Sequence, residues 1–440
     1  MIPTSSNLLP GMEALAWPEI PGAFRPDYGR SLTGIMPTVF RLLGQPRDGY
    51  GDLTGVLPPD SPRAAKRVFL LCVDALGFKE LAQSERLAGL YGRYGAWITS
   101  VFPTITSCAL SSIYQGLPPA RHGITGHIIW KDFPGAVVDM LKMQVPGAKA
   151  SLSDAGCDVN AWKREPGFLD RKEENGIASY HLMDRHIVGS GLSNLIYGAT
   201  PLVPFLNPLE GLHKVGRMLT EMERGWVGLY LDEVDVLGHV MTGETPQMGL
   251  MLRHLENSLA GMAAGMSAAA LEETVLMIAA DHGQSTIHTR LPLHGENMKW
   301  LKAHTRAVGN SGRVLHVYLD PGQEERVLPW LREFVGGAGR VFSFEEVMAL
   351  TGPPLDGTHA AGIENAGDAG NGLTGHADWV RRSLGDLVAI LDDGYNWQRK
   401  DPKRESSPYD SQLASQHGAL SWNEVFVPFI CAPMAALLEE

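Results

Sequence analysis

The sequence has few cysteines, and none of them forms a CxxC pair. Two of the four, Cys72 and Cys431, lie in apolar, strand-like runs, where small buried thiols are common. The other two, Cys108 and Cys157, stand alone in the sequence. This usage argues against a disulfide framework and favours a reducing compartment. We therefore expect a cytoplasmic protein.

Long apolar runs are also missing. No uninterrupted apolar stretch reaches the roughly 18 residues that a membrane-spanning helix needs. The first residues, MIPTSSNLLPGMEALAWPEIPGAF, lack a basic start followed by an apolar run, so they do not predict a signal peptide. We expect no membrane partner.

The sequence also lacks an excess of positive charge. The formal net charge is -12, which argues against a binder of duplex nucleic acid or of anionic membranes, because both need a basic surface. A small anionic substrate remains compatible with this charge, because bound metal ions can reverse the local field.

What the sequence does contain is a series of apolar runs of strand length that alternate with helical patterns. A continuous apolar run is typical of a strand buried on both faces of a parallel sheet. The alternation predicts an α/β fold with a mostly parallel central sheet and helices on both faces. The predicted strands are 67–74, 225–232, 274–281, 314–319, 386–391 and 425–431, with a helix at 324–335.

The remaining segments suggest a division of the chain. Residues 1–66 are rich in Pro and Gly and are predicted to form an N-terminal arm packed on the core, with one short helix near 34–43. Residues 67–440 are predicted to form the α/β domain, expected to be catalytic from the motifs described below. Its expected insertions are cap segments at about 124–220 and 284–312, and a Gly- and Ala-rich mobile loop at about 351–375.

The stretch 102–123 combines hydroxyl side chains with a strand-to-helix junction. Thr104, Thr106 and Ser107 follow a strand-like end, and an apolar helical segment continues to Gly116. Free backbone N–H groups and the helix dipole favour a phosphate at such a junction. The alternative is that Thr106 or Ser107 only caps the helix.

Acidic and histidine side chains stand at or near the ends of three predicted strands, and a late His-Gly pair follows. Carboxylate and imidazole groups are the ligands of zinc, manganese and iron ions. Each residue alone could be a turn or cap residue, but the joint pattern favours a metal site. The set comprises Asp74, Asp235, His239, Asp281, His282 and His417.

Together these segments resemble the alkaline phosphatase superfamily, and within it the type I phosphodiesterase and nucleotide pyrophosphatase branch. The resemblance is carried by 68–76, 102–123, 230–239, 278–284 and 417–428. It implies an alkaline phosphatase-like sheet with an inserted cap, and two divalent metal ions, zinc first and manganese as the alternative. A Thr or Ser nucleophile would lie between the ions.

The same resemblance implies a role for each residue. Asp74, Asp281 and His282 would hold one ion, and Asp235, His239 and His417 the other. The family nucleophile stands ten residues before a Gly-Leu pair, and counting back from Gly116 reaches Thr106 rather than Thr104.

The chain departs from the branch pattern in two places. It has Ser107-Cys108-Ala109-Leu110 where the branch often has an aromatic residue, Pro, Asn and His, which predicts a smaller and less aromatic pocket wall. It has His127 where the branch has a phosphate-binding Asn, so His127 and the backbone of Ser107 are the candidate substrate-binding groups. The alternative for His127 is a place on the cap surface.

The expected function is hydrolysis of small phosphate esters by a two-metal phosphodiesterase or nucleotide pyrophosphatase that forms a phospho-threonine intermediate. Four alternatives stay open: a phosphomonoesterase, for which Arg121 could supply positive charge; a phosphonate hydrolase; a metal-dependent phosphomutase; and a non-catalytic metal-binding module. The sequence indicates neither the leaving group nor the oligomeric state.

Overall fold

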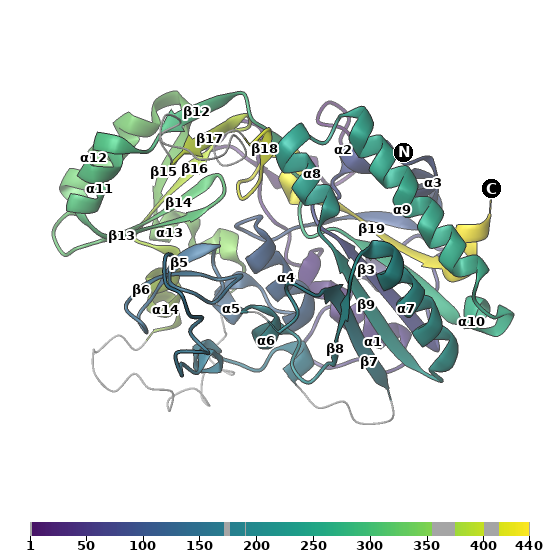
Figure 1. Ribbon diagram of the computed structural model, residues 1–440. Coiled ribbons are helices and arrows are strands. Elements are labelled where there is room, and N and C mark those ends of the chain that lie inside the picture. The colour runs from purple at the N-terminus through teal and green to yellow at the C-terminus, as the bar shows by residue number, and fades with distance from the viewer. Residues whose placement is uncertain (1, 171–176, 190, 354–374, 400–412, 440) are drawn as a thin grey trace.

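The computed structural model describes residues 2–170, 177–189, 191–353, 375–399 and 413–439. Its largest element is a seven-stranded sheet in which six strands run in one direction and β19 runs in the other (Figure 1). The prediction of a mostly parallel central sheet is therefore confirmed. In spatial order the strands are β4 (Gly95–Thr99), β19 (Phe426–Pro433), β10 (Thr274–Ala279), β3 (Arg67–Val73), β9 (Gly225–Leu231), β7 (Ala178–Asp184) and β8 (Leu202–Phe205).

Helices cover both faces of this sheet. Helices α7 (Pro208–Glu221) and α9 (Pro246–Ala264) pack on one face and α1 (Ile35–Leu42) on the other, as Figure 1 shows. Every residue of β3, β9 and β10 is buried, which explains why these strands read as continuous apolar runs. Because β3 lies between β10 and β9, the carboxyl ends of all three meet at one edge.

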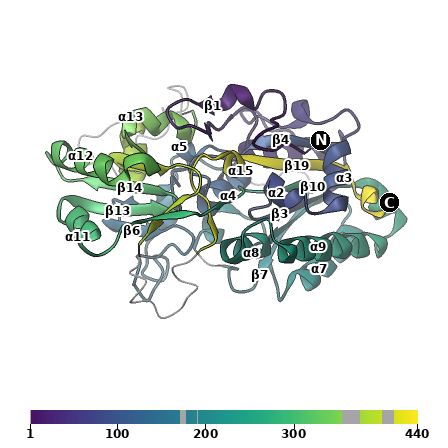
Figure 2. The same ribbon diagram turned by 90° about the horizontal axis from the view of Figure 1, so that it is seen from above.

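A second sheet of six strands stands beside the first, and every strand pair in it is antiparallel. Figure 2 shows this sheet and its helices on one side of the molecule, with the central sheet on the other. In spatial order the strands are β15 (Gly339–Ser343), β16 (Leu387–Leu391), β14 (Val314–Leu319), β13 (Thr305–Ser311), β5 (Ile128–Lys131) and β6 (Ala136–Asp139).

The existence of β14, β16 and α12 (Glu324–Val335) agrees with the sequence prediction, but both strands belong to this second sheet rather than to the central one. The sequence could not assign these strands to the right sheet because both are buried on two faces. Leu387, Ala389 and Leu391 join a small core under α11 (Gly295–Ala303) and α12, whereas Val388 and Ile390 face the main core. An antiparallel strand covered on both faces shows the same apolar run as a parallel one.

The segment 124–220, expected to be a cap, divides between the two sheets. Its β5 and β6 join the second sheet, and its β7 and β8 extend the central sheet beside β9. Strand β7 is only half-buried at its first residues, so its sequence lacks the apolar run that marks the inner strands. The division into arm, catalytic domain and insertions stays a prediction, and most of the expected mobile loop lies outside the described residues.

Two segments with a helical pattern in the sequence, 78–94 and 248–271, each form two helices in the structure. The segment 78–94 splits into α2 (Phe78–Leu81) and α3 (Glu85–Tyr94), because the Ser84 side chain caps the second helix by accepting a hydrogen bond from Leu87 N. The segment 248–271 splits into α9 and α10 (Ala268–Glu273), again at a serine cap, Ser267. None of the helices in the described ranges is long and apolar enough to cross a lipid bilayer.

Candidate metal centre and its nucleophile

The ends of β3 and β10 bring two carboxylates and a histidine together. Asp74 follows β3, and Asp281 and His282 follow β10. His282 Nε2 lies 3.5 Å from Asp74 Oδ1 and 3.2 Å from Asp281 Oδ2. One ligand atom from each residue lies within 4.8 Å of the others, and all three side chains are buried. The parallel pairing of β3 with β10 is what places these residues side by side.

A second group forms next to the first. Helix α8 (Glu233–Met241) carries Asp235 and His239 one turn apart, and His239 Nε2 lies 3.3 Å from Asp235 Oδ2. His417 Nε2 lies 3.5 Å from Asp235 Oδ1. Asp235, His282 and His417 have ligand atoms within 4.8 Å of one another, so His282 stands in both groups. The rings of His282 and His417 stack with their centroids 3.7 Å apart.

The three histidines share one tautomer. Each Nδ1 contacts a backbone carbonyl, which can only accept a hydrogen bond, so each Nδ1 must carry the proton. The acceptors are Ser415 O for His239 at 2.9 Å, Gly283 O for His282 at 3.2 Å and Thr104 O for His417 at 2.9 Å. In the neutral imidazole, each Nε2 therefore presents a lone pair toward the carboxylates.

Two carboxylate oxygens in the centre lack a donor. Asp74 Oδ1 and Asp281 Oδ2 are buried and have no hydrogen-bond partner among the described residues. The other oxygens are held: Asp74 Oδ2 accepts from the Tyr230 hydroxyl, and Asp281 Oδ1 accepts from Ala75 N at 3.0 Å. Converging lone pairs without donors cost free energy unless a cation or proton fills the space. The donor set therefore fits divalent metal ions.

Burial and the close approach of the acids also shift the pKa values of these groups. Burial, then Asp281 and Asp235, raises the pKa of Asp74 well above its usual range. Burial also raises the pKa of Asp281 to about 6 and lowers the pKa of His282 to about 4. Both shifts have the same cause, because burial disfavours the charged form of each group. A cation bound here would favour ionised carboxylates and neutral imidazoles, the forms in which these side chains bind metal.

Thr106 stands at the edge of this centre. It is the first residue of α4 (Thr106–Gln115), and its Oγ1 lies 3.2 Å from His282 Nε2. Ile105, in an extended conformation, occupies the N-cap position, and no side chain caps the helix. Thr106 and Ser107 are therefore not helix caps. Gly116 ends α4 in the left-handed conformation with φ +64°, which favours glycine.

The side chain of Ser107 points elsewhere. Its hydroxyl donates to Gly126 O at 3.0 Å. The first N–H groups of an α-helix have no acceptor within the helix, so the backbone of Ser107 remains the group suited to an anion. Thr104, which we set aside as a nucleophile, instead supports His417: its carbonyl accepts from the ring, and its hydroxyl accepts from Gly418 N at 3.0 Å.

His127 lies in the second sheet region rather than among the metal-binding candidates. Its Nε2 is 3.7 Å from Asp139 Oδ1, and its backbone N donates to Ser311 Oγ at 2.9 Å. Burial lowers its pKa, although Asp139 opposes this shift. Its role in substrate binding stays a prediction. Arg121 donates from Nε to Glu165 Oε1 at 2.6 Å, so it is engaged in an ion pair.

Sequence reasoning missed Gln284, which orients a metal-binding candidate. Its Nε2 donates to Asp235 Oδ1 at 2.5 Å and to Asp235 O at 3.1 Å. The Ser415 hydroxyl donates in turn to Gln284 Oε1. A Cβ added at Gly238 would lie 2.2 Å from Gln284 Oε1, so glycine is required there for this approach. Only its position directly after Asp281-His282-Gly283 could have drawn attention to Gln284.

Comparison with solved structures shows the fold. The structure of mouse ectonucleotide pyrophosphatase/phosphodiesterase 5 is similar with a TM-score of 0.56 at 16% identity, over 83% of this chain and 87% of that one. Phosphonoacetate hydrolase of Sinorhizobium meliloti 1021 is similar with a TM-score of 0.55 at 16% identity, over 86% and 95%. These matches confirm the expected alkaline phosphatase-like fold.

Comparison by sequence shows the family. No curated protein sequence matches the chain significantly. A family model described as type I phosphodiesterase / nucleotide pyrophosphatase matches residues 68–419, a span that includes all six metal-binding candidates and Thr106. Because this match covers most of its length, the chain belongs to the type I phosphodiesterase / nucleotide pyrophosphatase family of metal-dependent phosphoester hydrolases.

Proposed function

We propose that the protein hydrolyses small phosphate esters at a centre of two divalent metal ions, with a phosphodiester or nucleotide pyrophosphate as substrate and Thr106 as nucleophile. The observation that carries the proposal is the contact of 3.2 Å between Thr106 Oγ1 and His282 Nε2, beside two carboxylate oxygens that lack donors. A buried hydroxyl at a helix N-terminus and next to such a centre is placed for attack on phosphorus.

The metal ligands are proposed as two sets. Asp74, Asp281 and His282 would hold one ion, and Asp235, His239 and His417 the other. Zinc is the first choice and manganese the alternative, because carboxylates and imidazoles suit both. Ions bound there would lower the pKa of the hydroxyl and offset negative charge at phosphorus.

The residues of the chain perform two displacements in this account. Thr106 Oγ1 attacks phosphorus, the Thr–O–P bond forms, and the ester oxygen of the substrate leaves. Water then attacks the same phosphorus, and the bond to Thr106 breaks, which restores the hydroxyl. The backbone N–H groups at the start of α4 are placed to donate to a phosphoryl oxygen, and His127 is the candidate for a further donor.

The similar structures support a threonine in this role. One structure of the mouse protein is described as an inactive variant, with a threonine replaced by alanine, in complex with AMP.

The cytoplasmic location stays a proposal, and it rests on the free state of all four cysteines.

A phosphonate hydrolase is the second candidate. One observation favours it: the similar Sinorhizobium meliloti structure is described as a phosphonoacetate hydrolase with phosphonoacetate bound. A phosphomonoesterase is less well supported, because Arg121, the cation proposed for the additional charge, pairs with Glu165.

The experiment is hydrolysis of bis(p-nitrophenyl) phosphate by zinc- and manganese-loaded protein, compared with Thr106→Ala. The wild type should hold two ions per chain and hydrolyse the diester. Thr106→Ala should hold two ions and lose at least about a thousandfold in kcat. Full activity of Thr106→Ala would rule out the nucleophile, and fewer than two ions per wild-type chain would rule out the binuclear centre.

A further inference from the structure

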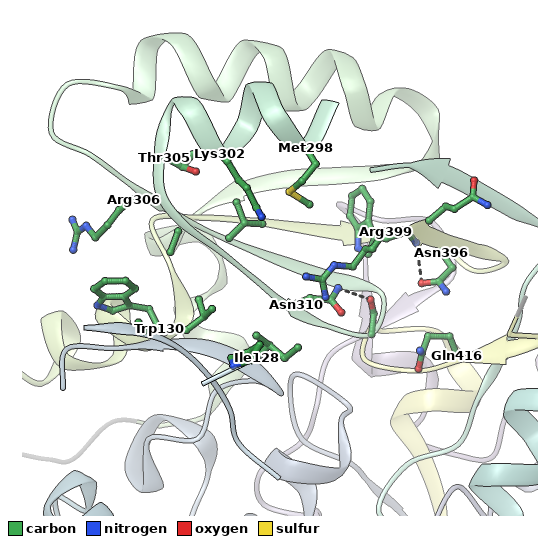
Figure 3. Close-up of a pocket in the computed structure, with 18 of the residues that line it drawn as sticks. Ile128, Trp130, Met298, Lys302, Thr305, Arg306, Asn310, Asn396, Arg399 and Gln416 are labelled. Carbon is green, nitrogen blue, oxygen red and sulfur yellow. Dashed lines mark hydrogen bonds between the residues drawn. The ribbon is translucent and has the colours of Figure 1, made fainter. Parts of the chain in front are cut away.

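A cavity of about 940 Å³ opens on the second sheet, outside the metal centre. Figure 3 shows Met298 and Lys302 reaching into it from above, and Ile128 and Trp130 from the strand below. Strand β13 forms one wall, and the end of β17 (Tyr395–Gln398) forms another. The volume matches that of sites that enclose a small organic molecule.

The charge of this cavity contrasts with that of the whole chain. Three cations line it, Lys302, Arg306 and Arg399, and no Asp or Glu does so among the described residues. The chain as a whole has a net charge of -12. Neither Lys302 nor Arg306 forms an ion pair with another described residue, and Arg306 donates to Leu319 O at 3.0 Å. A cavity with three cations and no acid in an acidic protein favours an anionic occupant.

The rest of the lining is apolar or uncharged. The indole rings of Trp130 and Trp397 and the side chain of Met298 supply apolar surface. Amide side chains of Asn310, Asn396 and Gln416 supply both donors and acceptors. This combination suits an organic anion with a carbon skeleton better than a bare inorganic ion.

The inner edge of the cavity borders the loop that bears His417. Gln416, which lines it, precedes His417, and His417 N donates to Gln416 Oε1 at 2.9 Å. Ile128, on another wall, follows His127. Gly312 closes the edge, because a Cβ there would lie 1.9 Å from His417 O. Along the chain, the cavity residue Gln416 is therefore next to His417, one of the metal-binding candidates.

We propose that the cavity binds the part of the substrate beyond the reacting phosphorus, and that this part carries a carboxylate or a further phosphate. The inference rests on the proposed function, because it takes the metal centre as the place of the reacting phosphorus. It narrows the substrate class from phosphate esters in general to those that carry a second anionic group.

Binding can be measured without turnover. Metal-free protein in EDTA is titrated by calorimetry with carboxymethyl phenyl phosphate, phosphonomethyl phenyl phosphate and methyl phenyl phosphate, which has no second anion. At least one of the first two should bind more tightly than the third, and the preferred one identifies the anion. Equal affinity for all three, or no binding of either dianionic probe, would overturn the proposal.

Variants locate the binding site. Lys302→Met combined with Arg399→Met should weaken binding of the preferred dianionic probe about tenfold and leave the methyl ester within about twofold. Both residues are exposed, so the fold should persist. The matched control is Lys299→Met on the same helix, where Lys299 does not line the cavity and lies 3.6 Å from Glu296. Unchanged binding in the double variant, or the same loss in the control, would overturn the assignment.

The p-nitrophenyl versions of the same esters separate this proposal from the proposed function. If metal-loaded wild type hydrolyses none of them, the proposed function fails, while the binding data still decide the role of the cavity. If it hydrolyses the methyl and dianionic esters with equal kcat/KM, the proposed function stands and the cavity proposal fails.

Discussion

Thr106 Oγ1 lies 3.2 Å from His282 Nε2, and His282 Nδ1 donates to Gly283 O. Because Nδ1 carries the ring proton, Nε2 accepts from the threonine hydroxyl in the metal-free protein. The same nitrogen lies beside free oxygens of Asp74 and Asp281. One histidine thus connects the proposed nucleophile with the centre proposed to activate it.

The acid cluster should destabilise the metal-free protein. Burial and the neighbouring acids raise the pKa of Asp74, which means that its charge is unfavourable there. Asp74→Asn should therefore raise Tm in EDTA by roughly 1–3 °C and reduce the rise in Tm that zinc causes in the wild type. The matched control is Asp320→Asn at the exposed residue directly after β14, which should change neither value. A lower Tm of Asp74→Asn in EDTA would contradict this account.

Gln284 should act through Asp235. Gln284→Met removes the donor to Asp235 Oδ1, so affinity for the second ion should fall about 10- to 100-fold while Tm in EDTA changes little. Competition with a metal-sensitive dye measures this affinity. Gly238→Ala provides an independent approach, because its methyl group would displace the Gln284 side chain. Wild-type affinity in both variants would show that Gln284 has no positioning role.

The acids could be located from sequence because the carboxyl ends of parallel strands meet at one edge of a sheet. The backbone groups that hold the site histidines could not be located from sequence. The bonds from His417 to Thr104 and from His239 to Ser415 join segments distant in the chain. The second sheet could not be distinguished from the central one by sequence, because β14 and β16 are apolar on both faces. The cavity combines side chains from both halves of the sequence, and no single motif marks it.

Arg313 should be essential for stability. Its guanidinium is fully buried, pairs with the buried carboxylate of Glu424 and donates from Nε to Tyr395 O at 2.9 Å. Arg313 N also donates to His417 O at 3.0 Å, so Arg313 joins the second sheet to the loop that bears His417. Arg313→Met leaves a buried charge unpaired and should cost about 3–5 kcal/mol in urea unfolding.

The double variant provides the check on the ion pair. Arg313→Met with Glu424→Gln removes both charges, so it should be more stable than Arg313→Met alone. Strictly additive losses would show that the two side chains act separately.

Glu80 should make stability depend on pH. Burial raises its pKa from 4.5 to about 7, and Glu80 Oε2 has no partner among the described residues. Above pH 4.5 the unfolded chain loses this proton while the folded chain keeps it until about pH 7, so this group lowers stability as pH rises through that interval. The loss is at most about 3 kcal/mol.

Glu80→Gln should therefore be more stable than the wild type at pH 8, and the difference should vanish near pH 4.5. Urea unfolding across this range measures it. Glu85→Gln on the exposed start of α3 is the control and should leave the pH profile unchanged. A difference between Glu80→Gln and wild type that is constant with pH would contradict the assignment.

The most direct test of the central claim is the stereochemical course at phosphorus. A chiral phosphorothioate diester is hydrolysed in heavy-oxygen water by the metal-loaded protein, and phosphorus NMR determines the configuration of the product. Each in-line displacement inverts the configuration, so attack by Thr106 followed by attack of water predicts net retention. Inversion would mean that water attacks the substrate directly and that Thr106 is not a nucleophile.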